Sequence, residues 1–169
     1  RSAVRSSPAS ALPPTADLAA TLAAMPVVIE EVTGSIAPAA VPSYPGGVRP
    51  SSVVTLAGAG AVGRGEHVGW DDAVHVAFHD RLAAIPRGTW CVGDWAAAIA
   101  EANAPPYDRA ALEAAAIDLA LRQRGTSLLA IAGATASSVR YVVSFERVAD
   151  PIAVARTHPP SAARQRAPY

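Results

Sequence analysis

Two histidines stand four residues apart in a stretch predicted to be helical, at His75 and His79. An α-helix turns once in about 3.6 residues, so this spacing puts both imidazoles on one face, as a helical zinc or nickel site requires. Asp80 follows, but Val-Ala-Phe stands between the histidines where a metalloprotease helix carries its glutamate. The alternative is an amphipathic surface helix with two partly exposed histidines. We favour that alternative and predict no metal ligands.

A glutamate and a histidine stand side by side at Glu66 and His67, with Trp70 and Asp71 close behind. Such a pair could transfer protons if both side chains faced a pocket. Packing at the end of a hairpin explains the same residues without any chemistry. The sequence leaves both explanations open.

Three further patterns that can mark chemistry are weak in this chain. The glycine-rich run from Gly58 to Gly63 is similar to a dinucleotide fingerprint, but no helix is predicted after it to hold a phosphate. No serine lies in the Gly-x-Ser-x-Gly surroundings of a nucleophile elbow. Cys91 is the only cysteine, which excludes an intramolecular disulfide and a cysteine-based zinc cluster. We expect it to be a half-buried, inert thiol.

Composition narrows the class of protein. All 14 basic side chains are arginine and 14 acidic side chains balance them, so the formal net charge is zero, which argues against a nucleic-acid partner. No apolar run reaches the roughly 18 residues of a membrane span, so we expect no membrane contact and a cytoplasmic protein. The absence of lysine removes one catalytic base, but histidine and carboxylate chemistry stays open.

The first half of the chain predicts strands. Alternating β-branched residues mark three of them in meander order, over Val27–Ile36, Ser51–Ala57 and Ala61–Val68. The run Gly58-Ala59-Gly60 predicts a hairpin turn between the second and the third. Between the first and the second we expect a long loop, Ala37–Pro50, which carries Tyr44 and is either functional or a flexible connection.

The second half predicts helices, each preceded by a side chain that can accept the amide protons of a first turn. The expected caps are Asp71 and Asp72, Asp94, Asp108 and Ser127, for helices over residues 71–84, 95–103, 109–124 and 128–132. One further strand, Ser138–Glu146, is apolar on both sides, as in a buried parallel sheet. The predicted fold class is α+β, with a three-stranded antiparallel meander followed by a helical lobe.

Two stretches carry a resemblance to a known family. The run Ala110–Gly133, followed by Ser138–Pro151, resembles the junction between capping domain and barrel in the enolase superfamily. Ser51–His75 is similar to that superfamily's hairpin, with its Gly-x-Gly-Glu at Gly63, Gly65 and Glu66. The group that is most similar is a set of actinobacterial enolase-like proteins related to muconate cycloisomerase and o-succinylbenzoate synthase.

The resemblance implies the domain that closes the mouth of a TIM-type barrel. In the family the barrel carries Mg²⁺ and the lysine or histidine bases that abstract a proton α to a carboxylate, in cycloisomerases, epimerases and dehydratases. The resemblance also implies capping loops that overhang the substrate, which makes Tyr44, His67 and Trp70 candidates for substrate contact. Gly63, Gly65 and Glu66 are expected to be structural. No catalytic base and no metal ligand can be carried over onto this sequence.

The expected organisation follows from this resemblance. Residues 1–25 form a loose leader, 26–136 the capping domain, 137–152 the first barrel strand and 153–169 an irregular tail. The chain is expected to be inactive alone, to contain no cofactor, and to need a barrel domain or a partner chain, with a carboxylate substrate and Mg²⁺ only in the complete enzyme. Whether it is an enzyme at all is left open. The alternative is a stand-alone binding or scaffold module that pairs with a partner.

Overall fold

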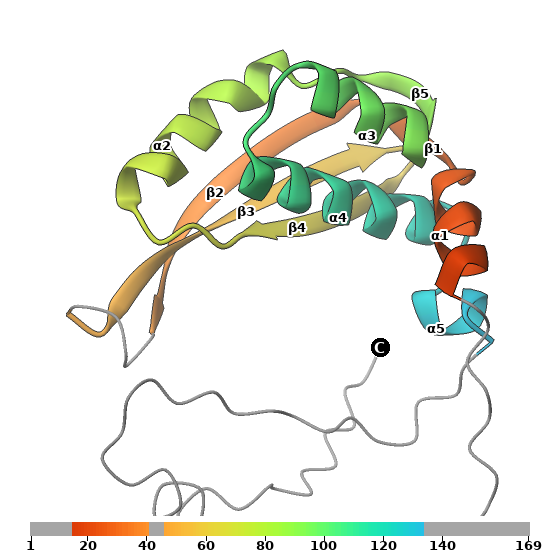
Figure 1. The fold of residues 1–169 in the computed structure, drawn as a ribbon, viewed down its shortest axis with the longest axis horizontal. Helices are drawn as coiled ribbons and strands as arrows, with labels where there is room; N and C mark the ends of the chain where they lie inside the picture. The colour runs from red at the N-terminus through yellow and green to blue at the C-terminus, as the bar shows by residue number, and fades with distance from the viewer. Residues whose placement is uncertain (1–14, 41–45, 134–169) are drawn as a thin grey trace, which may run out of the picture. The chain divides into compact units, whose positions relative to one another are not determined.

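A computed structural model describes residues 15–40 and 46–133 of the chain (Figure 1). These residues form five strands and five α-helices with one short 3₁₀ turn. In chain order the elements are α1 (Thr15–Ala23), β1 (Pro26–Ile29), β2 (Glu31–Ala40), β3 (Val48–Gly58), β4 (Ala61–His67), α2 (Asp72–Arg81), the 3₁₀ turn η1 (Leu82–Ala84), β5 (Gly88–Cys91), α3 (Val92–Glu101), α4 (Pro106–Gln123) and α5 (Leu128–Ile131).

The predicted three-stranded antiparallel meander is confirmed. Strands β2, β3 and β4 form one sheet in that order, and Val54 of β3 is paired with Gly34 of β2 and Gly65 of β4. The hairpin between β3 and β4 turns at Ala59 and Gly60, whose φ angles are +48° and +75°. Two consecutive positive φ angles are what a tight two-residue hairpin turn requires, and glycine supplies one of them without steric cost.

The first predicted strand is wrong in its extent. The run Val27–Ile36 divides at Glu30 into β1 and β2, and β1 leaves the meander to pair with β5, where Val27 lies opposite Trp90. Strand β5 was not predicted, because four residues are too few to show the alternation of apolar and polar side chains that marks a strand. The backbone amide of Glu30 still donates to the carbonyl of Ala57 over 2.8 Å, so the division costs no hydrogen bond at this point.

The predicted long loop Ala37–Pro50 is also largely wrong. Strand β2 continues to Ala40 and β3 already begins at Val48, with Pro38 opposite Pro50. Strand β4 reaches only as far as Ser52 along β3, so both prolines lie in a two-stranded extension. Each strand there has one open edge, where a residue without an N–H is tolerated. Tyr44 lies outside the described residues.

Two of the predicted helix caps are confirmed and two are not. Asp71 accepts the amide proton of Ala73 over 2.9 Å, and Ser127 accepts that of Ala130 over 3.2 Å. Helix α3 begins at Val92, so Asp94 lies inside its first turn. Helix α4 begins at Pro106, a favoured residue for this position because its missing N–H would be unpaired anyway. Asp108 therefore lies within the helix, and its carboxylate is free to turn inward.

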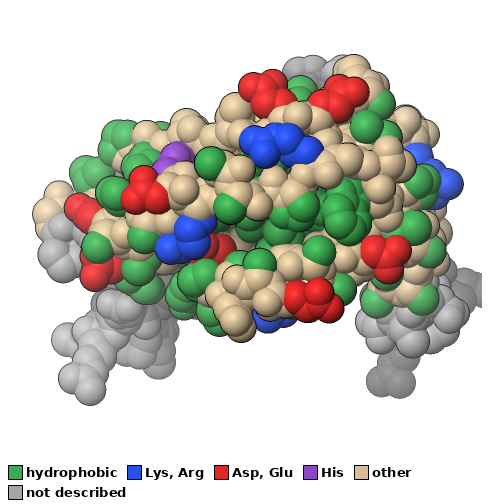
Figure 2. All heavy atoms as spheres, turned by 90° about the horizontal axis from the view of Figure 1, so that it is seen from above, with side chains coloured by type: hydrophobic (Ala, Val, Ile, Leu, Met, Phe, Trp, Pro, Cys, Tyr) green, Lys and Arg blue, Asp and Glu red, His purple; other side chains and the backbone are tan. Residues whose placement is uncertain are grey.

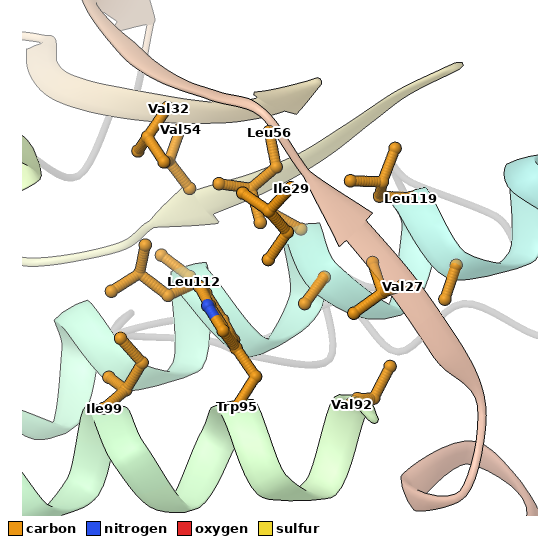
Figure 3. Packing of buried hydrophobic residues seen from close by; sticks show 14 of the residues in the cluster. Val27, Ile29, Val32, Val54, Leu56, Val92, Trp95, Ile99, Leu112 and Leu119 are labelled. Carbon is orange, nitrogen blue, oxygen red and sulfur yellow. The ribbon is translucent and has the colours of Figure 1, made fainter. Parts of the chain in front are cut away.

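Helices α2, α3 and α4 lie on one side of the sheet (Figure 1). Between them and the strands is the hydrophobic core, part of which is drawn in Figure 3. Trp95 is fully buried in it and donates its indole N–H to the carbonyl of Pro86 over 3.0 Å. Met25 is 1% exposed, so the residues expected to be a leader contain both helix α1 and a core side chain.

Helix α4 rests directly on the glycines of β4. A Cβ atom at Gly65 would overlap the carbonyl of Ala111, and one at Gly63 would overlap the backbone of Ala115. Glycine at these positions and alanine on the facing helix let the two backbones approach closely. The Gly-x-Gly part of the predicted structural motif thus sets the distance between helix and sheet.

None of the helices in the described part of the chain is long and apolar enough to cross a bilayer.

Candidate functional site: a buried histidine network

Three buried polar side chains meet where β4 ends, α2 begins and α4 makes its first turn. They are His67, His75 and Asp108, which are 1%, 0% and 2% exposed. They come from three different elements, and His67 and Asp108 are 41 positions apart in the sequence. Buried polar groups are costly unless each is hydrogen-bonded.

His67 is held by one donor and one acceptor. Its Nε2 lies 3.2 Å from Oδ1 of Asp108, and its Nδ1 accepts the amide proton of Gly69 over 3.3 Å. The two bonds together place the ring proton on Nε2. The ring also stacks on Phe78 with centroids 4.8 Å apart. Burial lowers the pKa of His67 below its ordinary value of 6.5, and the Asp108 charge only partly opposes this.

His75 uses both of its ring nitrogens as well. Its Nε2 lies 3.0 Å from the carbonyl of Gly69, which can only accept, so this nitrogen carries the proton. Its Nδ1 therefore accepts from the hydroxyl of Ser52 over 2.8 Å. The rings of His67 and His75 meet edge to face, 4.9 Å apart. The backbone of one residue, Gly69, thus donates its N–H to His67 and accepts from His75 at its carbonyl.

The prediction of two partly exposed histidines is wrong for His75, because the whole ring is in the core. His79 is half-buried beside Gly34, and its Nε2 is buried without a hydrogen-bond partner in the described structure. Both nitrogens of His75 are already hydrogen-bonded, so His75 has no free lone pair, and His75 and His79 cannot bind a metal ion together. Within residues 15–40 and 46–133, no three His, Cys, Asp or Glu side chains are grouped as metal ligands would be.

Asp108 balances its charge with Arg81. The Nε and one terminal nitrogen of Arg81 donate to Oδ2 of Asp108 over 2.8 and 2.7 Å, respectively. His67 is hydrogen-bonded to Oδ1 of the same carboxylate. The side chain of Asp108 is 3% exposed and that of Arg81 is 42% exposed, so the ion pair connects the core to the surface. Charge-assisted bonds of this kind are the stronger ones in proteins.

Of the two explanations left open for Glu66 and His67, an acid–base pair does not fit, because consecutive strand residues point to opposite faces. Glu66 faces away from the helices and accepts from the hydroxyl of Ser51 over 2.6 Å, with Arg49 at 3.8 Å. Ser52 and His75 have the spacing of a nucleophile and its base, but Ser52 is 0% exposed and no substrate could reach it. The network is therefore a polar core that joins three elements.

The surface above the network carries two aromatic side chains. Trp70 is 52% exposed, and the guanidinium of Arg49 lies 5.6 Å from its ring centroid. Tyr107 is also 52% exposed, with its ring 6.0 Å from that of His67. Of the predicted substrate-loop candidates, Trp70 reaches solvent while His67 supports the segment from beneath.

Sequence reasoning did not single out Ser52, Arg81 or the inward role of Asp108. Ser52 gave a signal, since it is a polar residue at an inward position of an alternating strand. Arg81 gave none, because an arginine near a helix end is expected at the surface.

Residues 20–131 match the family described as a domain of unknown function (DUF8230), N-terminal domain. The chain belongs to this family. The DUF8230 match begins within α1 and ends with α5, so every residue of the histidine network lies inside it. No curated protein and no solved structure matches the chain.

Proposed function

We propose that residues 26–136 are the capping domain of an enzyme of the enolase-superfamily type, which abstracts a proton α to a carboxylate. The observation that supports this most is the order of elements, an antiparallel meander followed by helices α2, α3 and α4 on one face of it. The resemblance carried by Ser51–His75 and Ala110–Gly133 implies the same order. The family description, an N-terminal domain, suits a domain that precedes another.

The role we propose for this domain is to exclude water from the reacting carboxylate and to shape the space around it. Trp70 is the side chain suited to touch a substrate, because its exposed ring can hold an apolar body, and Arg49 packs against that ring. His67 is a positioning residue, since its bonds to Gly69 and Asp108 fix the backbone just before Trp70.

Magnesium does not fit the described residues of this chain. The one deeply buried carboxylate, Asp108, is already neutralised by Arg81 and bonded by His67. We therefore assign the ion and the proton-abstracting bases to the barrel of the complete enzyme.

The test is deuterium exchange at the α-carbon of a panel of carboxylates, followed by NMR in D₂O with Mg²⁺. We expect no exchange with the 169-residue chain, and EDTA-sensitive exchange with the product of the complete coding frame. Trp70→Ala in that product should raise KM, while Asp72→Ala, an exposed residue at the start of α2, should not. Turnover by the 169-residue chain, or EDTA-insensitive exchange, would contradict the proposal.

A non-catalytic binding or scaffold module is the second candidate, and the far face of the sheet favours it. Residues on this face of β2 and β4 are exposed, among them Thr33, Ser35, Val62 and Glu66. A partner chain could cover that face. This candidate predicts a coding frame with no barrel and a complex whose formation is lost in a Val62→Glu variant.

A further inference from the structure

A pocket of about 120 Å³ opens on the helical side of the fold, away from Trp70. Its walls come from α2, η1, the segment after η1, the end of α3 and the start of α4. The lining includes Phe78, Arg81, Ile99, Ala102, Asp108 and Leu112. Figure 2 looks onto this helical side, where hydrophobic side chains are visible in a hollow among polar ones.

The size and the walls of the pocket favour a ring-sized apolar body. Phe78, Ile99 and Leu112 are each about 1% exposed, so the inner wall belongs to the core. Engineered apolar cavities of about 150 Å³ take up benzene, and ligand pockets are mostly apolar with a few placed polar groups. A volume of about 120 Å³ is of the same order.

The polar groups of the wall decide the charge of the ligand. Both oxygens of Asp108 are occupied, Oδ2 by Arg81 and Oδ1 by His67, so a cation finds no open carboxylate. An anion would have to approach that same carboxylate. The Nε and one terminal nitrogen of Arg81 donate hydrogen bonds to Asp108. Among the described residues, the other terminal nitrogen has no hydrogen-bond acceptor. That nitrogen can donate to an uncharged oxygen.

We propose that this pocket binds a small uncharged ring compound whose single oxygen accepts a hydrogen bond from Arg81. The ring lies against Ile85, Pro86 and Ala104, the half-buried apolar residues of the lining, above the buried wall. The oxygen lies at the edge of the pocket, where the guanidinium is half exposed. The site shares Arg81 and Asp108 with the histidine network, but it involves neither Trp70 nor the far face of the sheet.

The test uses three probes with one ring: cyclohexanone, cyclohexylammonium and cyclohexanecarboxylate, titrated into the ¹⁵N-labelled 169-residue chain. Cyclohexanone is expected to shift the backbone amides of residues 99–104 and the Nε–H resonance of Arg81, with saturation. The two charged probes should bind at least about tenfold more weakly. Ala102→Leu, at an exposed lining position just after α3, should abolish the shifts, and Ala97→Leu, exposed on α3 but outside the lining, should retain them.

Three results would overturn the proposal. The first is an absence of saturable shifts with cyclohexanone. The second is equal binding of a charged probe, or unchanged binding in Ala102→Leu. The third is a shift of the backbone amides with no change at the Arg81 resonance, which would remove the hydrogen bond from the site.

Discussion

Gly65 of β4 lies directly beneath Ala111 of α4, so close that the carbonyl of Ala111 occupies the space of a Cβ atom. Side chains normally hold a helix about 10 Å from a sheet, and removing them on both sides brings the backbones together. This contact fixes where α4 lies, and with it the position of Asp108 over the end of β4.

Gly65→Ala should therefore destabilise the fold. The added methyl must displace the α4 backbone, and overpacking of this kind costs about 3 kcal/mol of unfolding free energy. Arg64→Ala, one residue away on the exposed face, should change the unfolding free energy by less than about 0.5 kcal/mol. Urea unfolding followed by circular dichroism measures both, and equal values for the two variants would refute the close contact.

Asp108→Asn should destabilise the protein by about 2 kcal/mol. The substitution removes the charge that Arg81 balances, although the half-exposed guanidinium can recover part of the loss in water. Glu113→Gln is the matched control, because Glu113 pairs with Arg109 on the surface of the same helix over 3.9 Å. A surface pair of this type contributes less than about 1 kcal/mol. If both variants lost the same stability, Asp108 would not hold three elements together.

Stability should depend on pH through His67. Burial lowers the pKa of the folded state below 6.5, so the unfolded chain binds the proton more readily. The contribution of His67 is complete above pH 6.5 and is lost as the pH falls from there through the lower folded-state pKa. In His67→Gln, whose side chain can still donate to Asp108, this part of the pH dependence should vanish. Unfolding free energies of both proteins between about pH 8 and pH 5.5 would reveal it.

Gln123→Ala should cost about 2 kcal/mol, because it leaves part-buried backbone groups unpaired. The amide of Gln123 donates to the carbonyls of Val28 and Gly58 over 2.8 and 2.9 Å and accepts the Val28 amide proton over 3.0 Å. Hydrogen exchange at Val28 should become faster in this variant. In Arg122→Ala, which alters only an exposed ion pair, exchange at Val28 should stay slow.

How far the sequence predicts this fold depends on whether a signal is local. The alternation in Ala61–His67 and the Asp71 and Ser127 caps are local, and the structure confirms them. The division at Glu30 is not local, since it depends on β5, which is about 60 residues away and too short to recognise.

The candidate site shows the same limit. His75 is buried because Ser52 and Gly69 satisfy its two nitrogens, and neither partner is visible from the helix that carries it. Asp108 fits the pattern of a helix cap, yet Pro106 starts the helix two residues earlier and turns the carboxylate inward. The i, i+4 spacing of His75 and His79 predicted a shared face, but not which way that face points.

The departure of β1 from the meander has a consequence for the order in which the chain folds. The β3–β4 hairpin closes over a two-residue turn, whereas Val27 must meet Trp90 across more than 60 residues. Closing the longer loop carries the larger entropy cost, and such contacts are made late in folding. The hydrogen bond between Val28 and Gln123 spans 95 residues and needs α4 to be in place first. We therefore expect β1 to be the last strand to dock during folding and the first to detach during unfolding. The earliest partly unfolded state would then keep the meander and α4 in place and expose the edge of β5 that β1 had covered.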